Sequence, residues 1–192
     1  MPDVKKFVRT GFGQVEPNHL SAQRTSQIYA QLPANKDIKI LENGQYVKYD
    51  YPNGEVNFTG KGEWMMVFNE IKLYDDWRET YKDFALIKKN YTPGSTEITH
   101  SGVGPFKGQM VPRVFKTNVG DIFTTNCVGA GNTSGTNKYT GIAIEEGDLL
   151  KVNENGFLVT GGSVSTDNMV WEVVKVYTLA DGQPAVKIMR IK

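Results

Sequence analysis

The chain has few of the residues on which catalytic and metal sites are built. Its 192 residues include one cysteine and two histidines. Cys127 has no partner for an internal disulfide, and we expect it to be a small packed side chain, because free cysteine is among the most buried residue types. A zinc site needs four nitrogen or sulfur ligands, or three and a water, and Cys127, His19 and His100 are too widely spaced to suggest one. We therefore expect no metal and no cofactor.

The chain also lacks an excess of charge of either sign. Its 22 lysines and arginines against 21 aspartates and glutamates leave a formal charge of +1. Such a balance gives no electrostatic footprint for a phosphate backbone or an anionic membrane, so neither nucleic acid nor membrane is expected as a partner. No long apolar run follows the first residues, Met1 to Lys6, so we expect no signal peptide or membrane span and predict folding in a cytoplasm.

No recognisable catalytic motif is present. His19 and His100 lie in segments without an acidic partner nearby in sequence, and we expect both to be exposed and non-catalytic. Glycine-rich residues 11–16 lack the third glycine of a dinucleotide fingerprint, and residues 102–108 have the wrong spacing for one. The acidic pairs Asp75-Asp76 and Glu145-Glu146 could bind a cation, but solvated turns are the better interpretation. The sequence therefore predicts a protein that is not an enzyme.

Turn signals are what the chain does have. Asn43-Gly44, Asn53-Gly54, Asn155-Gly156 and Asp181-Gly182 are each flanked by short runs rich in Val, Ile, Phe and Tyr. Both central residues of a type I′ turn need positive φ, which Gly reaches freely and Asn or Asp tolerates, so these pairs predict β-hairpins. We expect an all-β fold of small antiparallel β-barrel or sandwich units with an extended N-terminal arm.

Composition divides the chain into four segments. Residues 1–34 are expected to form the arm, although residues 21–34 could also begin a short helix capped by Ser21. Residues 35–90 read as a front β-meander, interrupted by residues 75–82, which could form one or two helical turns. Residues 91–112 read as a loop or linker rich in Gly and Pro, and residues 113–192 as a back barrel-like unit.

Two stretches within the back unit are poor in large apolar residues. Residues 129–140 are almost wholly Gly, Ala, Asn, Ser and Thr, and residues 161–168 are shorter and similar. Such segments bury too little apolar area to offset the entropy lost on ordering, so both predict mobile surface loops.

The back unit also contains a weak internal echo. Gly120-Asp121 and the five residues after it are followed, 27 positions later, by a similar run that begins Gly147-Asp148. Each copy reads as a turn followed by a strand. Two copies are too few for a solenoid, which needs three or more stacked repeats.

Aromatic residues are plentiful, with nine Tyr, nine Phe and three Trp. In a sheet they most often pack across strands, so Trp64, Phe68, Phe123 and Trp171 are core candidates. An alternative is a carbohydrate-binding β module with exposed aromatic side chains, for which Trp77 and Trp171 are the candidates.

The run Gly147 to Val159, the strand Val173 to Tyr177 and the closing turn Asp181 to Lys187 resemble head proteins of tailed bacteriophages. The likeness is to the small β-rich decoration or auxiliary capsid proteins that bind the outside of a completed shell, and residues 16–24 also look like part of a phage structural protein. This resemblance implies strand, turn, strand, glycine-rich loop and terminal hairpin in that order. It implies no catalytic residues, because the family has no catalytic motif.

The sequence therefore predicts a virion structural protein, a capsid decoration protein whose partners are the major capsid protein and further copies of itself. Its location would be the capsid of a virion assembled in the host cytoplasm. Phe7, Phe12 and Leu20 of the arm are the expected capsid or subunit contacts. A neck, tail or head-fibre component and a carbohydrate-binding module are the alternatives.

Overall fold

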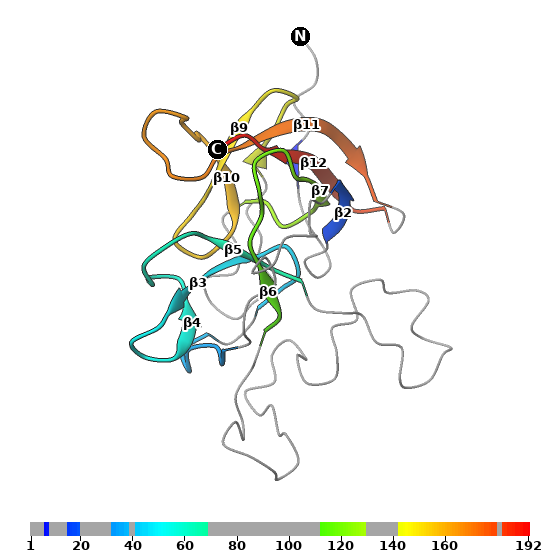
Figure 1. Cartoon of the computed structure of the whole chain (residues 1–192). Helices are drawn as coiled ribbons and strands as arrows, with labels where there is room; N and C mark the ends of the chain where they lie inside the picture. The colour runs from blue at the N-terminus through cyan, green and yellow to red at the C-terminus, as the bar shows by residue number, and fades with distance from the viewer. Residues whose placement is uncertain are drawn as a thin grey trace, which may run out of the picture.

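The computed structural model describes residues 6–7, 15–19, 32–38, 41–68, 112–129, 142–179 and 182–192. These residues form strands and turns, and no helix occurs among them. The expected all-β class is confirmed, as two antiparallel sheets of six and four strands and a separate two-stranded pair (Figure 1). Nor does this part of the chain include a helix long and apolar enough to cross a bilayer.

The six-stranded sheet comes from both ends of the chain. Its order is β10-β9-β11-β12-β7-β2, and every neighbouring pair is antiparallel. Its strands are β2 (Val15–His19), β7 (Ile122–Thr125), β9 (Leu149–Val152), β10 (Leu158–Thr160), β11 (Trp171–Thr178) and β12 (Pro184–Arg190).

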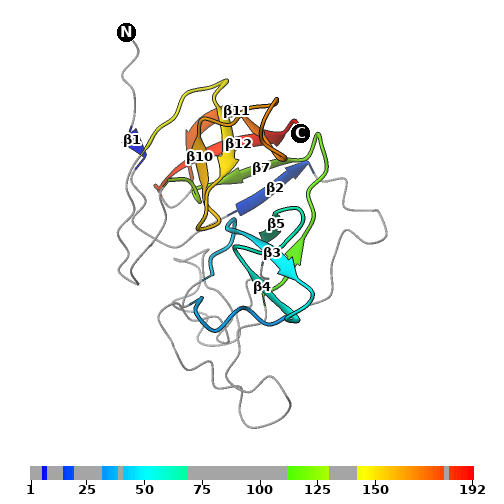
Figure 2. The same cartoon turned by 90° about the vertical axis from the view of Figure 1, so that its left-hand side faces the viewer.

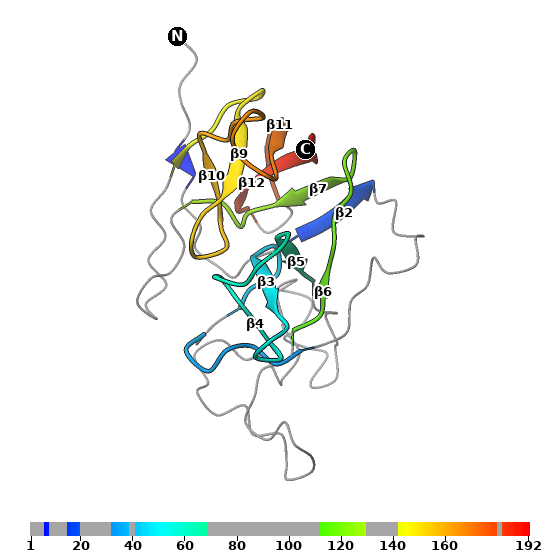
Figure 3. The same ribbon diagram turned by 60° about the vertical axis from the view of Figure 1, so that its left-hand side comes forward.

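The four-stranded sheet has the order β4-β3-β5-β6 and lies below the six-stranded sheet in Figure 1. Its strands are β3 (Tyr46–Asp50), β4 (Glu55–Asn57), β5 (Met65–Val67) and β6 (Val114–Phe115). Figure 3 shows the segment after β6 rising from this sheet into β7 of the other. The two-stranded pair joins β1 (Lys6–Phe7) to β8 (Ile142–Ala143).

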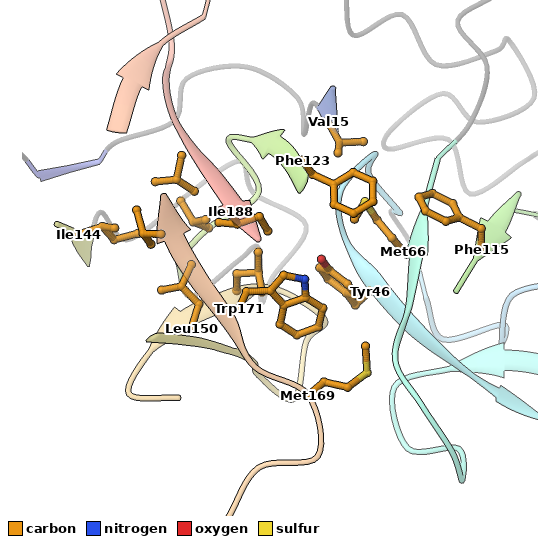
Figure 4. Close-up of a cluster of buried hydrophobic side chains, with 14 residues drawn as sticks. Val15, Tyr46, Met66, Phe115, Phe123, Ile144, Leu150, Met169, Trp171 and Ile188 are labelled. Atoms are coloured by element: carbon orange, nitrogen blue, oxygen red, sulfur yellow. The ribbon is translucent and has the colours of Figure 1, made fainter. Parts of the chain in front are cut away.

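A shared core joins the two larger sheets. Trp171, Phe123 and Ile188 of the six-stranded sheet pack in one cluster with Tyr46 and Met66 of the four-stranded sheet (Figure 4). The predictions of Phe123 and Trp171 as core residues are confirmed, whereas Trp64 and Phe68 are only partly buried and pack against this cluster from outside it. A second cluster, which includes Leu41, Val47 and Val56, fills the four-stranded sheet's other side. Burying apolar area of this kind, at about 25 cal/mol per Å², is the main stabilising contribution to such a fold.

The expected barrel does not close in the described residues. A single parallel bridge joins Val128, just after β7, to Leu158 of the distant strand β10. Because β7 and β10 are separated by three strands in the sheet order, this bridge requires strong curling of the sheet. One bridge is not a continuous ladder, so the sheet remains open, with β2 at one end and β10 at the other.

Part of the segment predicted to be an arm is a strand of the six-stranded sheet. Residues Val15–His19 were assigned to the arm, yet they pair with β7 as an edge strand of this sheet. Val15 is buried in the shared core. Pro17 concealed this strand in the sequence, because proline cannot donate to a ladder; at a sheet edge that loss is tolerated. A short helix was the alternative for residues 21–34; residues 32–34 are not helical, and Ala34 forms a β-bridge with Val56. Residues 21–31 and 75–82 lie outside the described part.

The four turn signals produce turns, but not two-residue hairpins. The turn at Asn43-Gly44 leads into β3, but residues 41–42 directly before it are not part of a strand. Asn53-Gly54 lies in the connection between β3 and β4, where Asp50 pairs with Glu55 and leaves a loop of residues 51–54. The other two signals lie in the β9–β10 and β11–β12 connections, which are also longer than two residues. The signals therefore predicted the positions of turns more reliably than their type.

The sequence echo is confirmed as a structural repeat. In each copy the aspartate Oδ2 accepts a hydrogen bond from the main-chain N–H three residues earlier, Asn118 N for Asp121 and Glu145 N for Asp148, both at 2.8 Å. In each copy the glycine N–H donates to one residue of the neighbouring strand, and that residue's N–H donates to the aspartate carbonyl. The partner residue is Arg190 of β12 for the first copy and Val173 of β11 for the second.

The repeat extends to the whole six-stranded sheet. A half turn about the pair Glu172–Met189 exchanges β11 with β12, β9 with β7 and β10 with β2, and the strand registers agree. The pair Leu150–Trp171 thereby corresponds to Phe123–Ile188, and Val152–Leu158 corresponds to Thr125–Val15. The sheet thus has an internal approximate two-fold symmetry. The 27-residue spacing of the two Gly-Asp turns relates only β7 to β9, so it did not predict this symmetry.

Two contacts fix the sheets against each other. In the β9–β10 loop the Gly156 carbonyl accepts a hydrogen bond of 2.7 Å from Tyr46 N, and the Asn155 carbonyl accepts one of 2.8 Å from Gln45 Nε2. A Cβ on Gly156 would lie 2.1 Å from the Tyr46 carbonyl oxygen, so only glycine permits this approach. On the other side, Arg190 of β12 forms an ion pair of 2.6 Å with Glu63, which precedes β5.

Candidate functional site

Of the three predicted contact residues, the structure describes one. Phe7 lies in β1, where its main chain is opposite Ile142 of β8. Figure 2 shows β1 at one side of the molecule, apart from the six-stranded sheet. Phe12 and Leu20 lie outside the described residues, so their role as contacts stays a prediction.

The titratable residues singled out in the sequence do not converge. His19 is the last residue of β2, and its main chain is opposite Ile122; His100 lies outside the described residues. Glu145 and Glu146 are exposed in the second of the two repeated turns. Within the described segments no three His, Cys, Asp or Glu side chains are grouped so as to hold a metal ion. Cys127 is fully buried, as predicted.

Trp171 is excluded as a sugar-stacking surface. It is fully buried, and its ring centroid lies 4.9 Å from that of Tyr46 in an edge-on arrangement (Figure 4). The sequence signal was ambiguous because an aromatic residue in a strand can face either side. Trp77, the other candidate, lies outside the described residues.

The side chains that do converge on a hollow come from strand β3, the turn before β5, strand β9 and the loop after β10. This hollow, of about 200 Å³, lies between the two larger sheets. We call it the inter-sheet pocket. The residues that give it its chemistry are Lys48, Glu63, Trp64, Lys151, Asp167 and Asn168.

Lys48 is the most informative residue of the inter-sheet pocket. Its Nζ lies 4.5 Å from the centroid of the Trp64 ring, within the range of a cation–π interaction. Lys48 is half-buried, and among the described residues no carboxylate forms an ion pair with its Nζ. The ring therefore replaces a carboxylate as the neighbour of this ammonium group.

The other charges of the pocket are paired. Lys151 Nζ lies 3.8 Å from Asp167 Oδ1. Glu63 forms ion pairs with Arg190 at 2.6 Å and with Lys116 at 3.7 Å. Lys48 thus contributes a positive charge to the pocket that no carboxylate of the described residues balances.

The loop after β10 presents Asp167 in a fixed position. Asp167 Oδ2 accepts a hydrogen bond of 2.8 Å from Ser163 N, and Asp167 N donates one of 2.9 Å to the Ser163 carbonyl. The sequence predicted a surface loop over residues 161–168, which is confirmed, but these bonds show that it is an ordered one.

The sequence did not predict the inter-sheet pocket. Lys48 and Asp167 are far apart in the chain, and only the packing of the two sheets brings them together. The one available signal was Trp64, a tryptophan beside glycine-rich turn residues, and the core interpretation fitted it equally well.

Two polar atoms inside the shared core lack hydrogen-bond partners, the hydroxyl of Tyr46 and the indole Nε1 of Trp171. Burial raises the pKa of Tyr46 well above its usual value; the nearby Cys127 raises it further, while Arg190 opposes this shift. These groups lie in the core and do not line the inter-sheet pocket, so we assign them no chemical role.

Comparison with known proteins gives no relative for this chain. No protein-family model matches it. No curated protein and no solved structure matches it either.

Proposed function

We propose that this chain is a virion structural protein without catalytic activity, a decoration protein that binds the outside of a phage head. Its antiparallel sheets form a rigid sandwich-like body, and residues near the N-terminus serve as an extended arm. The proposal includes contacts with the major capsid protein and with further copies of this chain. It rests on the resemblance of the strand and turn pattern to phage head proteins and on the placement of the N-terminal residues.

The observation that carries the proposal is the pairing of β1 with β8. Lys6 and Phe7 are bonded to Ala143 and Ile142 through the main chain, in a small sheet separate from the two larger ones. Main-chain pairing of an extended segment with a strand is a common way for one protein chain to bind another. An N-terminal segment that pairs in this way is suited to reach a neighbouring subunit as well as its own β8.

Multiple weak contacts would suffice for such a protein. Linking several contacts in one oligomer raises the overall avidity by roughly 10²- to 10⁴-fold over a single contact. Each copy could therefore hold a shell with a small interface, such as one short strand and a few apolar anchors. Phe7, Phe12 and Leu20 remain the proposed anchors.

The test is a co-sedimentation assay with purified heads of the phage that encodes the chain. A deletion of residues 1–20 would remove β2 from the six-stranded sheet and confuse binding with folding. We therefore choose deletion of residues 1–7, which removes β1 and leaves β2. The shortened chain is expected to keep its β circular-dichroism spectrum and lose at least tenfold in affinity for heads, whereas Val164→Ser, at an exposed loop residue, is expected to bind normally.

Failure of the full-length chain to bind heads would contradict the proposal. A cryo-EM map of particles that carry the chain places it directly: density on the outside of the shell supports a decoration protein. Density at the neck, tail or a head fibre would favour the alternative virion roles.

A further inference from the structure

We infer that the inter-sheet pocket binds an acidic sugar, with the sugar carboxylate on Lys48. The inference concerns a site that the proposed capsid role does not use, and it does not depend on that role. It is carried by the size of the pocket, the charge of Lys48 and the mixture of groups around it.

The volume of the pocket limits the ligand to one small ring. Pockets for drug-sized molecules measure about 300–1,000 Å³. The inter-sheet pocket measures about 200 Å³ and is partly open to solvent. A single monosaccharide unit is of suitable size, and an open side allows that unit to belong to a longer chain.

The charge of the pocket favours an anion. Asp167 is paired with Lys151, and Glu63 with Arg190 and Lys116, which leaves Lys48 as the cation beside Trp64. An ammonium group without a carboxylate partner gains from a charge-assisted hydrogen bond to an anion. The carboxylate of a uronic acid provides that anion.

The remaining lining favours a sugar over a simple carboxylate. Asn168 and Thr166 offer an amide and a hydroxyl group for hydrogen bonds to sugar hydroxyls, and Asp167 offers a carboxylate. The exposed apolar part of the lining is small and comes from Trp64 and Val152, so it contacts only one edge of a sugar ring. A ligand that combines a negative charge with several hydroxyls uses all of the polar groups of the pocket, whereas a simple carboxylate does not.

The test is an NMR titration of the full-length, ¹⁵N-labelled chain with sodium glucuronate. We expect saturable shifts of the Trp64 indole N–H and of the backbone amides of residues 166–168, with a dissociation constant in the millimolar range. Glucose, which lacks the carboxylate, and acetate, which lacks the ring, are each expected to bind at least tenfold more weakly. Absence of saturable shifts with glucuronate would overturn the inference, and so would equal binding of acetate.

The matched variants are Lys48→Met and Lys175→Met. Lys48→Met removes the ammonium group of the pocket and is expected to weaken glucuronate binding at least tenfold. Lys175 is exposed on β11 and does not line the pocket, so its replacement is expected to leave the affinity unchanged. If Lys48→Met disturbs the fold, Lys48→Arg keeps the charge and is expected to retain binding. Undiminished binding by a folded Lys48→Met chain would overturn the assignment of the carboxylate to Lys48.

Discussion

At the scale of single residues, the most unusual feature is the pair of unpartnered polar atoms in the shared core. The hydroxyl of Tyr46 and Nε1 of Trp171 are buried and have no hydrogen-bond partner. A buried polar group without a partner costs about 1–3 kcal/mol relative to one that is paired or absent. The large rings of both residues nevertheless stabilise the core through the apolar area that they bury and through their edge-on contact.

Tyr46→Phe is therefore expected to stabilise the protein. The substitution removes the unpartnered hydroxyl and keeps the ring, so the free energy of unfolding should rise by about 1 kcal/mol in urea denaturation. Tyr51→Phe, at an exposed tyrosine, is the control and should change it by less than about 0.5 kcal/mol. A loss of 1 kcal/mol or more in Tyr46→Phe would show that the hydroxyl is bonded in the folded protein.

The same variant should also respond differently to alkali. Because burial raises the pKa of Tyr46 in the folded state, the unfolded chain releases the tyrosine proton at lower pH than the folded chain does. Proton release by Tyr46 in the unfolded chain therefore lowers the free energy of unfolding of the wild-type protein as the pH rises above about 10, the pKa of an unfolded tyrosine. Phenylalanine has no proton to release, so the advantage of Tyr46→Phe in unfolding free energy should grow above that pH.

At the scale of elements, the two Gly-Asp turns offer an internal comparison within one protein. Both have the same hydrogen bonds to the neighbouring strand and the same side-chain bond of 2.8 Å. They differ in environment, because Asp121 is buried and Asp148 is half-buried. Water can replace a lost hydrogen bond at the second site far better than at the first.

Asp121→Ala is accordingly expected to lower the free energy of unfolding by about 2 kcal/mol, and Asp148→Ala by about 1 kcal/mol or less. Asp→Asn at each position keeps an oxygen acceptor and should cost less than the alanine substitution at that position. The measurement is urea denaturation of the four variants. A larger loss at Asp148 than at Asp121 would contradict the role given to burial.

The sequence was most informative about secondary-structure elements, that is, about where turns and strands lie. The glycines with positive φ at Gly120 and Gly147, each followed by Asp and two apolar residues, are local signals, so turns and strands could be predicted there. The edge strand Val15–His19 could not, because its pairing partner β7 is about a hundred residues away in the chain and Pro17 weakens the local pattern. The inter-sheet pocket could not be predicted for the same reason: its lysine and its loop are brought together only by packing.

At the scale of the whole molecule, the two larger sheets form one core and are joined by Arg190. Its guanidinium group donates hydrogen bonds to the Thr117 carbonyl, to Glu63 Oε1 at 2.6 Å and to the Lys192 carbonyl at 2.8 Å. Arg190 thereby connects β12, the segment between β6 and β7, and the turn before β5. The front and back units that composition separates at residues 91–112 therefore share a core and this ionic contact across the sheets.

Arg190→Met is expected to lower the free energy of unfolding by about 3 kcal/mol, because the buried guanidinium is the donor to the Thr117 and Lys192 carbonyls as well as to Glu63. Glu63→Ala should cost only about 1 kcal/mol, because the guanidinium that remains keeps its hydrogen bonds to the two carbonyls. Urea denaturation followed by fluorescence and by circular dichroism measures both. Because the core is continuous, the two probes should give one coincident transition in the wild-type chain and in each variant. Equal losses of unfolding free energy in the two variants would show that the ion pair, rather than the main-chain bonds of Arg190, accounts for the stability that Arg190 contributes. Separate transitions by the two probes would show that the two sheets unfold independently.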